Sequence, residues 1–385
     1  MSLKISNIKL SVVRLELVHG FETSSHRKSH LDHILVRVTT ADGLTGWGEC
    51  ASPSAPFYCG ETTQTCWYVL HDHLGPALLG REWRHPAEAA TMMAHVSGNN
   101  FARAGLEMAC WDLYGKSRGR SLSEELGGTS RSVDAGVSLG IEADIDALLE
   151  RVNSHADNGY WRVKLKIRPG WDLEPVRHVR EAFPDLALQV DANTAYTRDD
   201  ISHLAELDPF GLLMIEQPFA AEDLLTHATL RERIQTPVCL DESITSLATL
   251  RTAMHLKACS IVNIKVSRLG GIGVARSVHD ECRANGVPVW CGGMHEFGVG
   301  RAANLAVASL SGFILPSDVS GSAKYYARDV VIPEIVASDG KVAVPRTPGI
   351  GVEVDEDFVQ QCTRRMVELT EDKGARIRAA ARTGT

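Results

Sequence analysis

The chain lacks the sequence features of membrane-inserted and exported proteins. No apolar run approaches the roughly 20 residues that are needed to cross a bilayer. The N-terminal segment MSLKISNIKL has no uninterrupted apolar core of the kind that a signal peptide carries. We therefore expect a cytoplasmic protein with no membrane partner.

The sequence also lacks the patterns of a disulfide framework or a zinc site, and it has no excess of positive charge. Its nine cysteines are odd in number and form no CxxC pair, so they fit small core side chains in a reducing compartment. The net charge of −8 argues against nucleic acid or an anionic membrane as the main partner. The stretch from about Val133 to Asp318 has no Ser/Pro-rich linker and no low-complexity tract.

What the sequence does contain is a set of charged residues at nearly constant spacing. Lys166, Asp191, Glu216, Asp241 and Lys265 are separated by 25, 25, 25 and 24 residues. That interval is about one strand, one helix and two short loops. Each residue stands at or just past the end of a short apolar run that favours a β-strand, namely VKLKI, LALQVD, LLMIEQP, PVCLDES and SIVNIK.

This spacing is typical of successive βα units in a parallel barrel. The carboxyl ends of barrel strands converge on one face, so residues about 25 apart in sequence become neighbours around one pocket. The chain has 385 residues, of which 44% are hydrophobic and 23% are charged. That is long enough for a barrel of about 200 to 250 residues and a second domain. We expect three carboxylates to lie between two lysines.

The domain organisation predicted from the sequence has three parts. Residues 1–130 form an α+β module, in which HILVRVTT and LTGWGEC flank a hairpin turn at residues 41–43 and a helix runs from about Asn100 to Gly119. Residues 131–319 alternate strand-like and helix-like segments and form the barrel. Residues 320–385 return to short β-like pieces and then a polar helix, and we expect this tail to pack back on the first module.

The three carboxylates predict a metal site. Acids that converge in a partly buried pocket repel one another, and a hard divalent cation relieves that repulsion. The set of Asp191, Glu216 and Asp241 contains only oxygen ligands, which favours Mg²⁺ or Mn²⁺ over zinc.

The lysines predict proton transfer at carbon. Lys164 and Lys166 are two residues apart in a strand and project from the same face. Interior placement would lower the pKa of such a pair, because each ammonium group is repelled by the other and by the nearby metal charge, and partial burial disfavours charge. Lys265 would stand across the pocket. Two bases on either side of a metal-bound carboxylate could remove and return an α-proton through a metal-stabilised enediolate, so racemisation or syn elimination follows naturally.

These residues resemble the enolase superfamily and, within it, the muconate lactonizing enzyme group. The resemblance covers most of the chain and rests on LEMACWDLYGKSRGRSLSEELGG, VKLKI, VDANTAY, IEQPF, LDES and NIK. It implies a (β/α)7β-type TIM barrel with an α+β capping domain built from the N-terminal region and the C-terminal tail. It also implies that Asp191, Glu216 and Asp241 are metal ligands, that Lys166 and Lys265 are the acid/base pair, and that Lys164 lies beside the substrate carboxylate.

Further segments are similar to one branch, the o-succinylbenzoate synthases and N-succinyl (or N-acyl) amino acid racemases. They are KIRPGWD, KVSRLGG, CGGMHEFGVGRAAN and LPSDVSGSAKYY. By this resemblance Arg268 matches an arginine that is associated with racemase activity through the second lysine. Residues 21–26 and 56–58, including Phe21 and Tyr58, belong to mobile capping loops that close over the substrate. The barrel positions that approach the substrate are Ser138, Asn193, Gly292, Gly293 and Met294.

The sequence departs from this branch at one place, and it also lacks features expected of two other groups of the superfamily. Many members have an aliphatic residue and then Glu-Ser or Glu-Thr after GGM, whereas this chain has His295-Glu296-Phe297, so the pocket shape differs. A dipeptide epimerase would show Asp-x-Asp after the eighth strand, but here Asp318 is followed by Val-Ser. An acid-sugar dehydratase would use a histidine near His295, yet Lys265 occupies the sixth strand, where such enzymes have Asp or Asn.

Three functions therefore remain open. The first is a metal-dependent racemase of N-acyl amino acids, chiefly N-succinyl ones, with or without o-succinylbenzoate synthase activity. The second is a cycloisomerase of the muconate type that uses the same lysines. The third is a binding or scaffold protein that has kept the pattern by descent. In the first two cases the partner is a small-molecule carboxylate, and the family resemblance implies a homo-oligomer.

Overall fold

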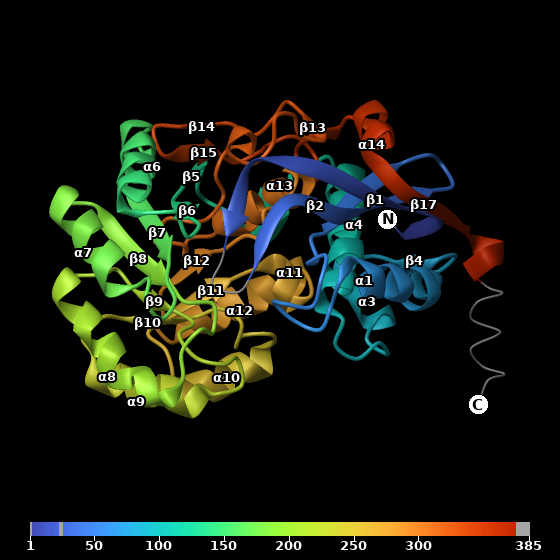
Figure 1. Ribbon diagram of the computed structural model, residues 1–385. Helices are drawn as coiled ribbons and strands as arrows, with labels where there is room; N and C mark the ends of the chain where they lie inside the picture. The colour runs from blue at the N-terminus through green and yellow to red at the C-terminus, as the bar shows by residue number, and fades with distance from the viewer. Residues whose placement is uncertain (1, 23–25, 375–385) are drawn as a thin grey trace.

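The computed structural model describes residues 2–22 and 26–374. The first part of the chain forms an antiparallel sheet with strand order β17-β1-β2-β3, and β4 pairs with the start of β1. Figure 1 shows the C-terminal strand lying beside the N-terminal one. The strands are β1 (Leu3–Glu22), β2 (Arg27–Thr40), β3 (Thr45–Cys50), β4 (Glu82–Trp83) and β17 (Thr363–Thr370).

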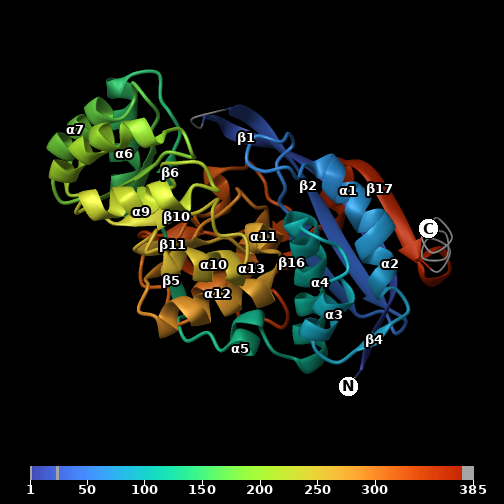
Figure 2. The same ribbon diagram turned by 90° about the horizontal axis from the view of Figure 1, so that it is seen from below.

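The predicted hairpin is confirmed, since β2 and β3 pair across the turn at residues 41–43. The longer hairpin formed by β1 and β2 has two parts. In its basal part, β1 pairs with β2 from Ile5 to Glu16, and pairing resumes only at Phe21 and Glu22. We call the described residues 17–22 and 26–30 the hairpin tip. The tip reaches from the antiparallel sheet toward the barrel strands (Figures 1 and 2). Residues 23–25 of the predicted capping loop lie outside the described residues.

The predicted helix from about Asn100 to Gly119 is confirmed as α4 (Asn100–Arg118), which ends at Gly119 in the left-handed conformation with φ 64°. It is buried on most of its circumference, because the antiparallel sheet packs on one side and the barrel on the other (Figure 2). Glycines allow close packing: a Cβ on Gly48 of β3 would lie 2.0 Å from the carbonyl oxygen of Gly105. The neighbouring helices are α1 (Thr63–Val69), η1 (Leu70–Leu74), α2 (Gly75–Leu78), α3 (Pro86–Met92) and α5 (Leu122–Leu126).

The barrel predicted from the spacing is present as a seven-stranded parallel sheet with order β12-β11-β10-β9-β8-β7-β6. The extended segment 313–318 closes it, because Phe313 bridges to β12 and Ser317 bridges to Ala135 beside β6. The barrel strands are β6 (Val137–Leu139), β7 (Arg162–Lys166), β8 (Ala187–Asp191), β9 (Ile215–Glu216), β10 (Val238–Leu240), β11 (Ile261–Ile264) and β12 (Val289–Cys291).

Helices follow the barrel strands and cover the outside of the sheet (Figure 1). Several begin at a side chain that accepts a hydrogen bond from the first turn, including Asp144, Asp172, Asp223 and Ser246. These helices are α6 (Ile145–Asp157), α7 (Leu173–Ala182), η2 (Arg198–Asp200), α8 (Ile201–Leu204), η3 (Ala205–Phe210), α9 (Leu224–Arg233), α10 (Leu247–His255), α11 (Val266–Leu269), α12 (Ile272–Ala284) and α13 (Gly298–Ala308).

The C-terminal segment returns to the antiparallel sheet, as the sequence predicts, and part of the tail in which the polar helix was predicted, residues 375–385, lies outside the described residues. The helix α14 (Glu356–Cys362) is short, and residues 363–370 form β17, which pairs with β1. The open edge of β1 offers backbone partners that outweigh the helical propensity of this segment. The other elements are η4 (Ser322–Lys324), β5 (Ser132–Asp134), β13 (Val331–Ile332), β14 (Ala337–Ser338), β15 (Lys341–Ala343) and β16 (Glu353–Val354).

Two buried carboxylates join the antiparallel module to the barrel. Glu49 of β3 accepts hydrogen bonds from the backbone N–H groups of Phe297 and Gly300 at the start of α13, both at 2.8 Å. Glu107 of α4 accepts from the N–H groups of Ile272 and Gly273 at the start of α12, at 2.8 and 2.9 Å. Helix N-termini favour negative charge, so these contacts fix the module on the barrel. Among the described residues, no helix is long and apolar enough to span a membrane.

Candidate active site

The five regularly spaced residues stand where the sequence predicts them. Lys166, Asp191 and Glu216 are the last residues of β7, β8 and β9, while Asp241 and Lys265 come directly after β10 and β11. Because adjacent parallel strands pair in register here, their side chains meet at one end of the barrel. All five are buried, and the two lysines are 8% and 7% exposed.

A cavity of about 290 Å³ lies above this strand end, between the barrel and the capping module. Of the predicted site residues, it is lined by Phe21, Tyr58, Ser138, Lys164, Lys166, Asn193, Lys265, Gly293 and Met294. Gly292 and Arg268 do not line it. A Cβ on Gly292 would meet the side chain of Asn263, so that glycine makes room for a neighbour beneath the cavity. The three carboxylates lie below the lining residues and are at most 1% exposed.

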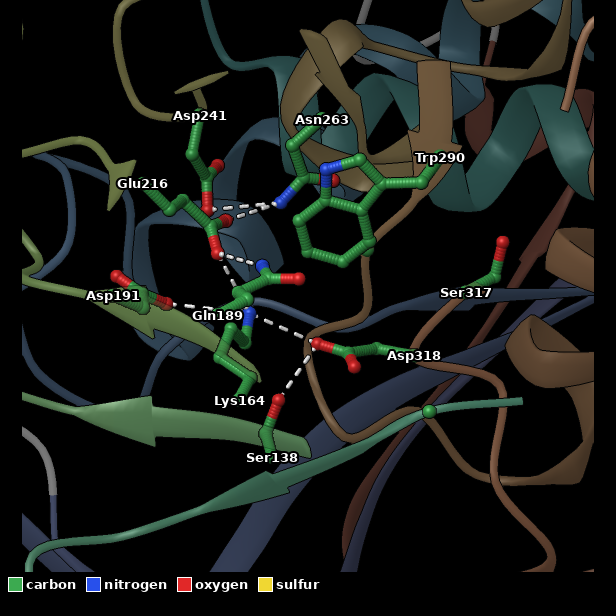
Figure 3. Close-up of polar contacts among 12 residues, drawn as sticks. Ser138, Lys164, Gln189, Asp191, Glu216, Asp241, Asn263, Trp290, Ser317 and Asp318 are labelled. Carbon is green, nitrogen blue, oxygen red and sulfur yellow. Dashed lines mark hydrogen bonds and ion pairs between the residues drawn. The ribbon is translucent and has the colours of Figure 1, made fainter. Parts of the chain in front are cut away.

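The lysines are paired with the carboxylates of the barrel. Lys166 Nζ donates to Asp191 Oδ2 at 2.6 Å, and Lys265 Nζ lies 2.7 Å from Asp241 Oδ2. Lys164 Nζ lies between two of the acids, at 3.2 Å from Asp191 Oδ2 and 2.9 Å from Glu216 Oε2 (Figure 3). Lysine ammonium groups and carboxylates therefore lie next to one another at the carboxyl end of the barrel.

A layer of polar and aromatic side chains beneath the carboxylates was not predicted. Asn263 Nδ2 donates to Glu216 Oε1 at 2.6 Å and to Asp241 Oδ2 at 3.2 Å, and Gln189 Nε2 donates to Glu216 Oε2 at 3.1 Å (Figure 3). The indole of Trp290 lies 4.7 Å from Lys164 Nζ. Gln189 and Asn263 each stand two residues before a strand-end charged residue. The two-residue repeat of a strand was therefore the signal that could have found them.

A second unpredicted group holds Lys164 from the far side. Asp318, which follows the closing segment, lies 2.9 Å from Lys164 Nζ, accepts from Arg162 Nη1 at 2.8 Å and accepts from Ser138 Oγ at 2.8 Å. Arg162 precedes Lys164 by two residues in β7. Because alternate residues of a strand point to the same face, the sequence could have predicted that Arg162 points into the barrel. The position of Asp318 depends on how the barrel closes, which no local pattern indicates.

The pKa directions differ from the sequence expectation. Burial disfavours the charged form of Lys164, but three neighbouring carboxylates outweigh it and hold its pKa well above the ordinary value. At Lys265, burial also lowers the pKa of the ammonium group, but the negative charges of Asp241 and Glu242 outweigh burial and raise it. The expected lowering included the charge of a bound metal ion and stays a prediction, whereas the acids around Lys164 favour its charged form as the side chains stand.

Arg268 and Tyr58 both act on the acid that holds Lys265. Arg268 donates to Asp241 Oδ1 and, at 2.7 Å, to the carbonyl oxygen of Ile244. The hydroxyl of Tyr58 donates to Asp241 Oδ1 at 2.9 Å, and its ring centroid lies 5.0 Å from Lys265 Nζ. The resemblance implied an influence of Arg268 on the second lysine, and the geometry supplies a route for it through the shared carboxylate.

The donor set fits a hard divalent cation, although the side chains are not gathered around one point. Among the described residues, no three His, Cys, Asp or Glu side chains form a group that could hold a metal ion as they stand. The ammonium of Lys164 lies between Asp191 and Glu216 instead. Burial and the nearby Asp191 raise the pKa of Glu216 to about 8, which reflects the repulsion expected among these acids. Three carboxylate oxygens with no sulfur ligand suit Mg²⁺ or Mn²⁺.

Comparison with known proteins places this geometry in a family. Residues 147–358 match the family model described as enolase C-terminal domain-like. Residues 7–127 match the N-terminal domain model of mandelate racemase / muconate lactonizing enzyme. The structure is similar to a solved member of the enolase superfamily from Listeria innocua, with a TM-score of 0.93 and 37% identity over 96% of this chain and all of the other.

Two curated relatives extend this comparison to named enzymes. The chain is 48% identical to an N-succinylamino acid racemase of Amycolatopsis, over 95% of this chain and 99% of that protein. It is 46% identical to an o-succinylbenzoate synthase of Geobacillus kaustophilus, over 94% of this chain and 97% of that protein. The chain is therefore an enzyme of the mandelate racemase / muconate lactonizing enzyme family, within the enolase superfamily.

Proposed function

We propose that the protein is a divalent-metal-dependent racemase of N-acyl amino acids, chiefly N-succinyl ones, in which two lysines move the α-proton. The observation that carries this proposal is the placement of Lys166 and Lys265. They line one cavity, come from strands separated by β8, β9 and β10, and are held by different carboxylates. Two separate bases around one small cavity suit a reaction that visits both faces of a carbon.

The residues of the chain divide the chemistry between them. In its neutral form one lysine takes the α-proton from one face of the substrate and leaves an enediolate. The other lysine, as an ammonium, then donates a proton to the opposite face, and the net change is inversion of the α-carbon. Lys164, held by Asp318, lies beside the acids and would contribute positive charge near the substrate carboxylate.

We further propose that Asp191, Glu216 and Asp241 hold the metal. When bound, the metal supplies positive charge beside the substrate carboxylate and so favours loss of the α-proton. The donor layer of Asn263 and Gln189 fixes the orientation of these carboxylates from below. Metal binding then requires Lys164 to leave its place between Asp191 and Glu216.

The test follows each α-proton by proton NMR. N-succinyl-L-phenylalanine and its D enantiomer are incubated separately in D₂O with enzyme and Mg²⁺, and loss of the α-proton signal is recorded together with optical rotation. We expect the wild-type protein to exchange both. Lys166→Ala should abolish exchange of one enantiomer and Lys265→Ala exchange of the other, with a loss of about 10² to 10⁴-fold for a missing base.

Lys373→Ala is the matched control, because Lys373 is an exposed lysine outside the cavity lining. It should leave both rates unchanged. Retention of full exchange for both enantiomers in Lys166→Ala would contradict the assignment, and it would also be the result expected for a scaffold protein that has merely kept the pattern.

A second candidate reaction at the same site is o-succinylbenzoate synthesis by syn dehydration. It is favoured by the 46% identity to the named synthase, and it begins with the same α-proton abstraction. A direct assay with the dehydration substrate separates the two reactions. The muconate-type cycloisomerase remains the alternative that the sequence left open, and no contact in the cavity favours it. A homo-oligomer stays a prediction from the family resemblance.

A further inference from the structure

One lysine of the cavity has no acid partner. Four lysines line the cavity, and the three that come from barrel strands, Lys164, Lys166 and Lys265, are each within 3.2 Å of a carboxylate oxygen. The fourth, Lys28, comes from the hairpin tip at the start of β2. Its backbone pairs with Phe21 of β1, but among residues 2–22 and 26–374 its side chain makes no hydrogen bond or ion pair.

The surroundings of Lys28 make an unpaired cation costly. Burial lowers its pKa to about 7, and repulsion from Lys166 and Lys265 acts in the same direction. The negative charge of Glu296 opposes them. A methionine or glutamine would fill this place without the free-energy cost of burying a charge. The presence of a lysine is therefore explained best by an anionic group of the substrate that binds to it.

His295 also lines the cavity, and one of its ring nitrogens has no partner in the part of the chain that the structure describes. The Nδ1 atom of His295 is buried without a hydrogen-bond partner among the described residues. The ring is held between Phe21 of the hairpin tip and Tyr325, with centroid distances of 4.5 and 5.0 Å. After burial, Lys28 is the group that lowers the pKa of His295 most, so the two side chains are electrostatic neighbours. The neutral ring can donate one hydrogen bond.

We propose that Lys28 and His295 bind a second carboxylate of the substrate, at the far end of its acyl group. This inference rests on the proposed function, in which the first carboxylate lies beside the strand-end acids and the α-carbon lies between Lys166 and Lys265. The hairpin tip forms the opposite wall, so a group bound there is remote from the α-carbon. The enzyme therefore selects dicarboxylic acyl groups, of which succinyl is one, and Lys28 is a specificity-determining residue.

The experiment compares two substrates that differ only in this charge. N-succinyl-L-phenylalanine carries the terminal carboxylate, and N-succinamoyl-L-phenylalanine carries a neutral amide of the same size. We expect kcat/KM for α-proton exchange to favour the succinyl compound by about 10- to 100-fold in the wild-type protein, the range for a charge-assisted contact. Lys28→Met should remove this preference by raising KM for the succinyl compound alone, and Lys28→Arg should retain most of it.

Arg27→Met is the matched control, because Arg27 is the exposed neighbour of Lys28 in β2 and is absent from the cavity lining. It should leave the preference intact. Equal rates on both substrates in the wild-type protein would overturn the inference and leave the proposed function standing. An equal loss on both substrates in Lys28→Met would also overturn it, since Lys28 would then act at the reacting centre. Failure of the wild-type protein to exchange either compound would reject the proposed function, and the inference with it.

Discussion

At the scale of single residues, the site is built from side chains in two layers. The upper layer holds the strand-end acids and lysines, and the lower layer holds Gln189, Asn263 and Trp290, which donate to the acids or pack against Lys164. A carboxylate that accepts fixed hydrogen bonds from below has one orientation, so its remaining oxygen lone pairs face the lysines that pair with it. The lower layer thus sets the direction in which the upper layer can act.

The charge of Lys28 gives a pH dependence that is separable from catalysis. Lys28 is cationic below its pKa of about 7 in the free protein and neutral above it. Its contact with a substrate carboxylate is therefore fully available below that value and is lost as the pH rises through it. The charged groups that act on it are Lys166, Lys265 and Glu296.

We expect the ratio of kcat/KM for the succinyl and succinamoyl substrates to fall as the pH rises through about 7. Steady-state rates over a pH series measure this ratio, from which the titration of the proton-transfer lysines cancels. Lys28→Arg should flatten the profile, because arginine stays charged. A wild-type ratio that is constant with pH, or that rises, would contradict the prediction.

The residues of the site differ in how well sequence alone predicts them. Spacing placed Asp191 and Lys265 correctly, because one βα unit has a nearly fixed length and strand ends converge. Lys28 and Asp318 were not assigned to the site, since each reaches it through a loop or closing segment whose path depends on packing over the whole molecule. The roles of all these side chains remain predictions that only the experiments above can test.

At the scale of elements, the contact between α4 and β3 depends on glycines. A Cβ on Gly48 would lie 2.0 Å from the carbonyl oxygen of Gly105 and 2.6 Å from the backbone nitrogen of Ala109. Both neighbours are backbone atoms, so the helix itself would have to move. Since α4 also carries Glu107, a shift of this helix would disturb the contact with α12.

We expect Gly48→Ala to lower the free energy of unfolding by about 3 kcal/mol, as overpacking against a rigid backbone does. Urea denaturation followed by circular dichroism measures the change. Gly60→Ala is the control, because a Cβ on Gly60 has no atom within 4 Å and its φ is not in the left-handed region. Equal stability of the two variants would show that the helix is free to adjust.

The elements were predictable where local pattern and tertiary packing agree. The helix α4 has apolar residues around most of its circumference and a glycine at its end, and it lies where expected. The segment TRRMVELT of β17 contains good helix formers, so no local pattern marks it as a strand. Its conformation is decided by pairing with β1, whose sequence lies more than 340 residues away.

At the scale of the whole molecule, the capping module and the barrel share buried ionic contacts. Glu49 accepts from Phe297 and Gly300, and it also lies 2.7 Å from His33 Nδ1 in its own sheet. A carboxylate in this place satisfies donors from both parts of the fold, whereas an amide would turn an N–H group toward another donor.

We expect Glu49→Gln to destabilise the protein by about 1.5–3 kcal/mol, the usual worth of a hydrogen bond to a charged group. Thermal unfolding followed by circular dichroism and by tryptophan fluorescence measures the loss. Glu150→Gln, at an exposed position of α6, is the control and should leave the midpoint unchanged. An unchanged midpoint in Glu49→Gln would mean that the charge of Glu49 contributes nothing to holding the two parts together.

The interrupted pairing of β1 and β2 has a consequence for how such enzymes diversify. The base of the hairpin is fixed by continuous pairing from Asn7 to Glu16, whereas the tip that carries Phe21 and Lys28 pairs separately. Mutations in the tip can therefore accumulate without disturbing Lys166 and Lys265, the proposed proton-transfer residues, which belong to the barrel. Substitutions among about a dozen residues of the tip can thus change which acyl group is preferred. The substrate range can diverge in this way while the reaction chemistry stays the same.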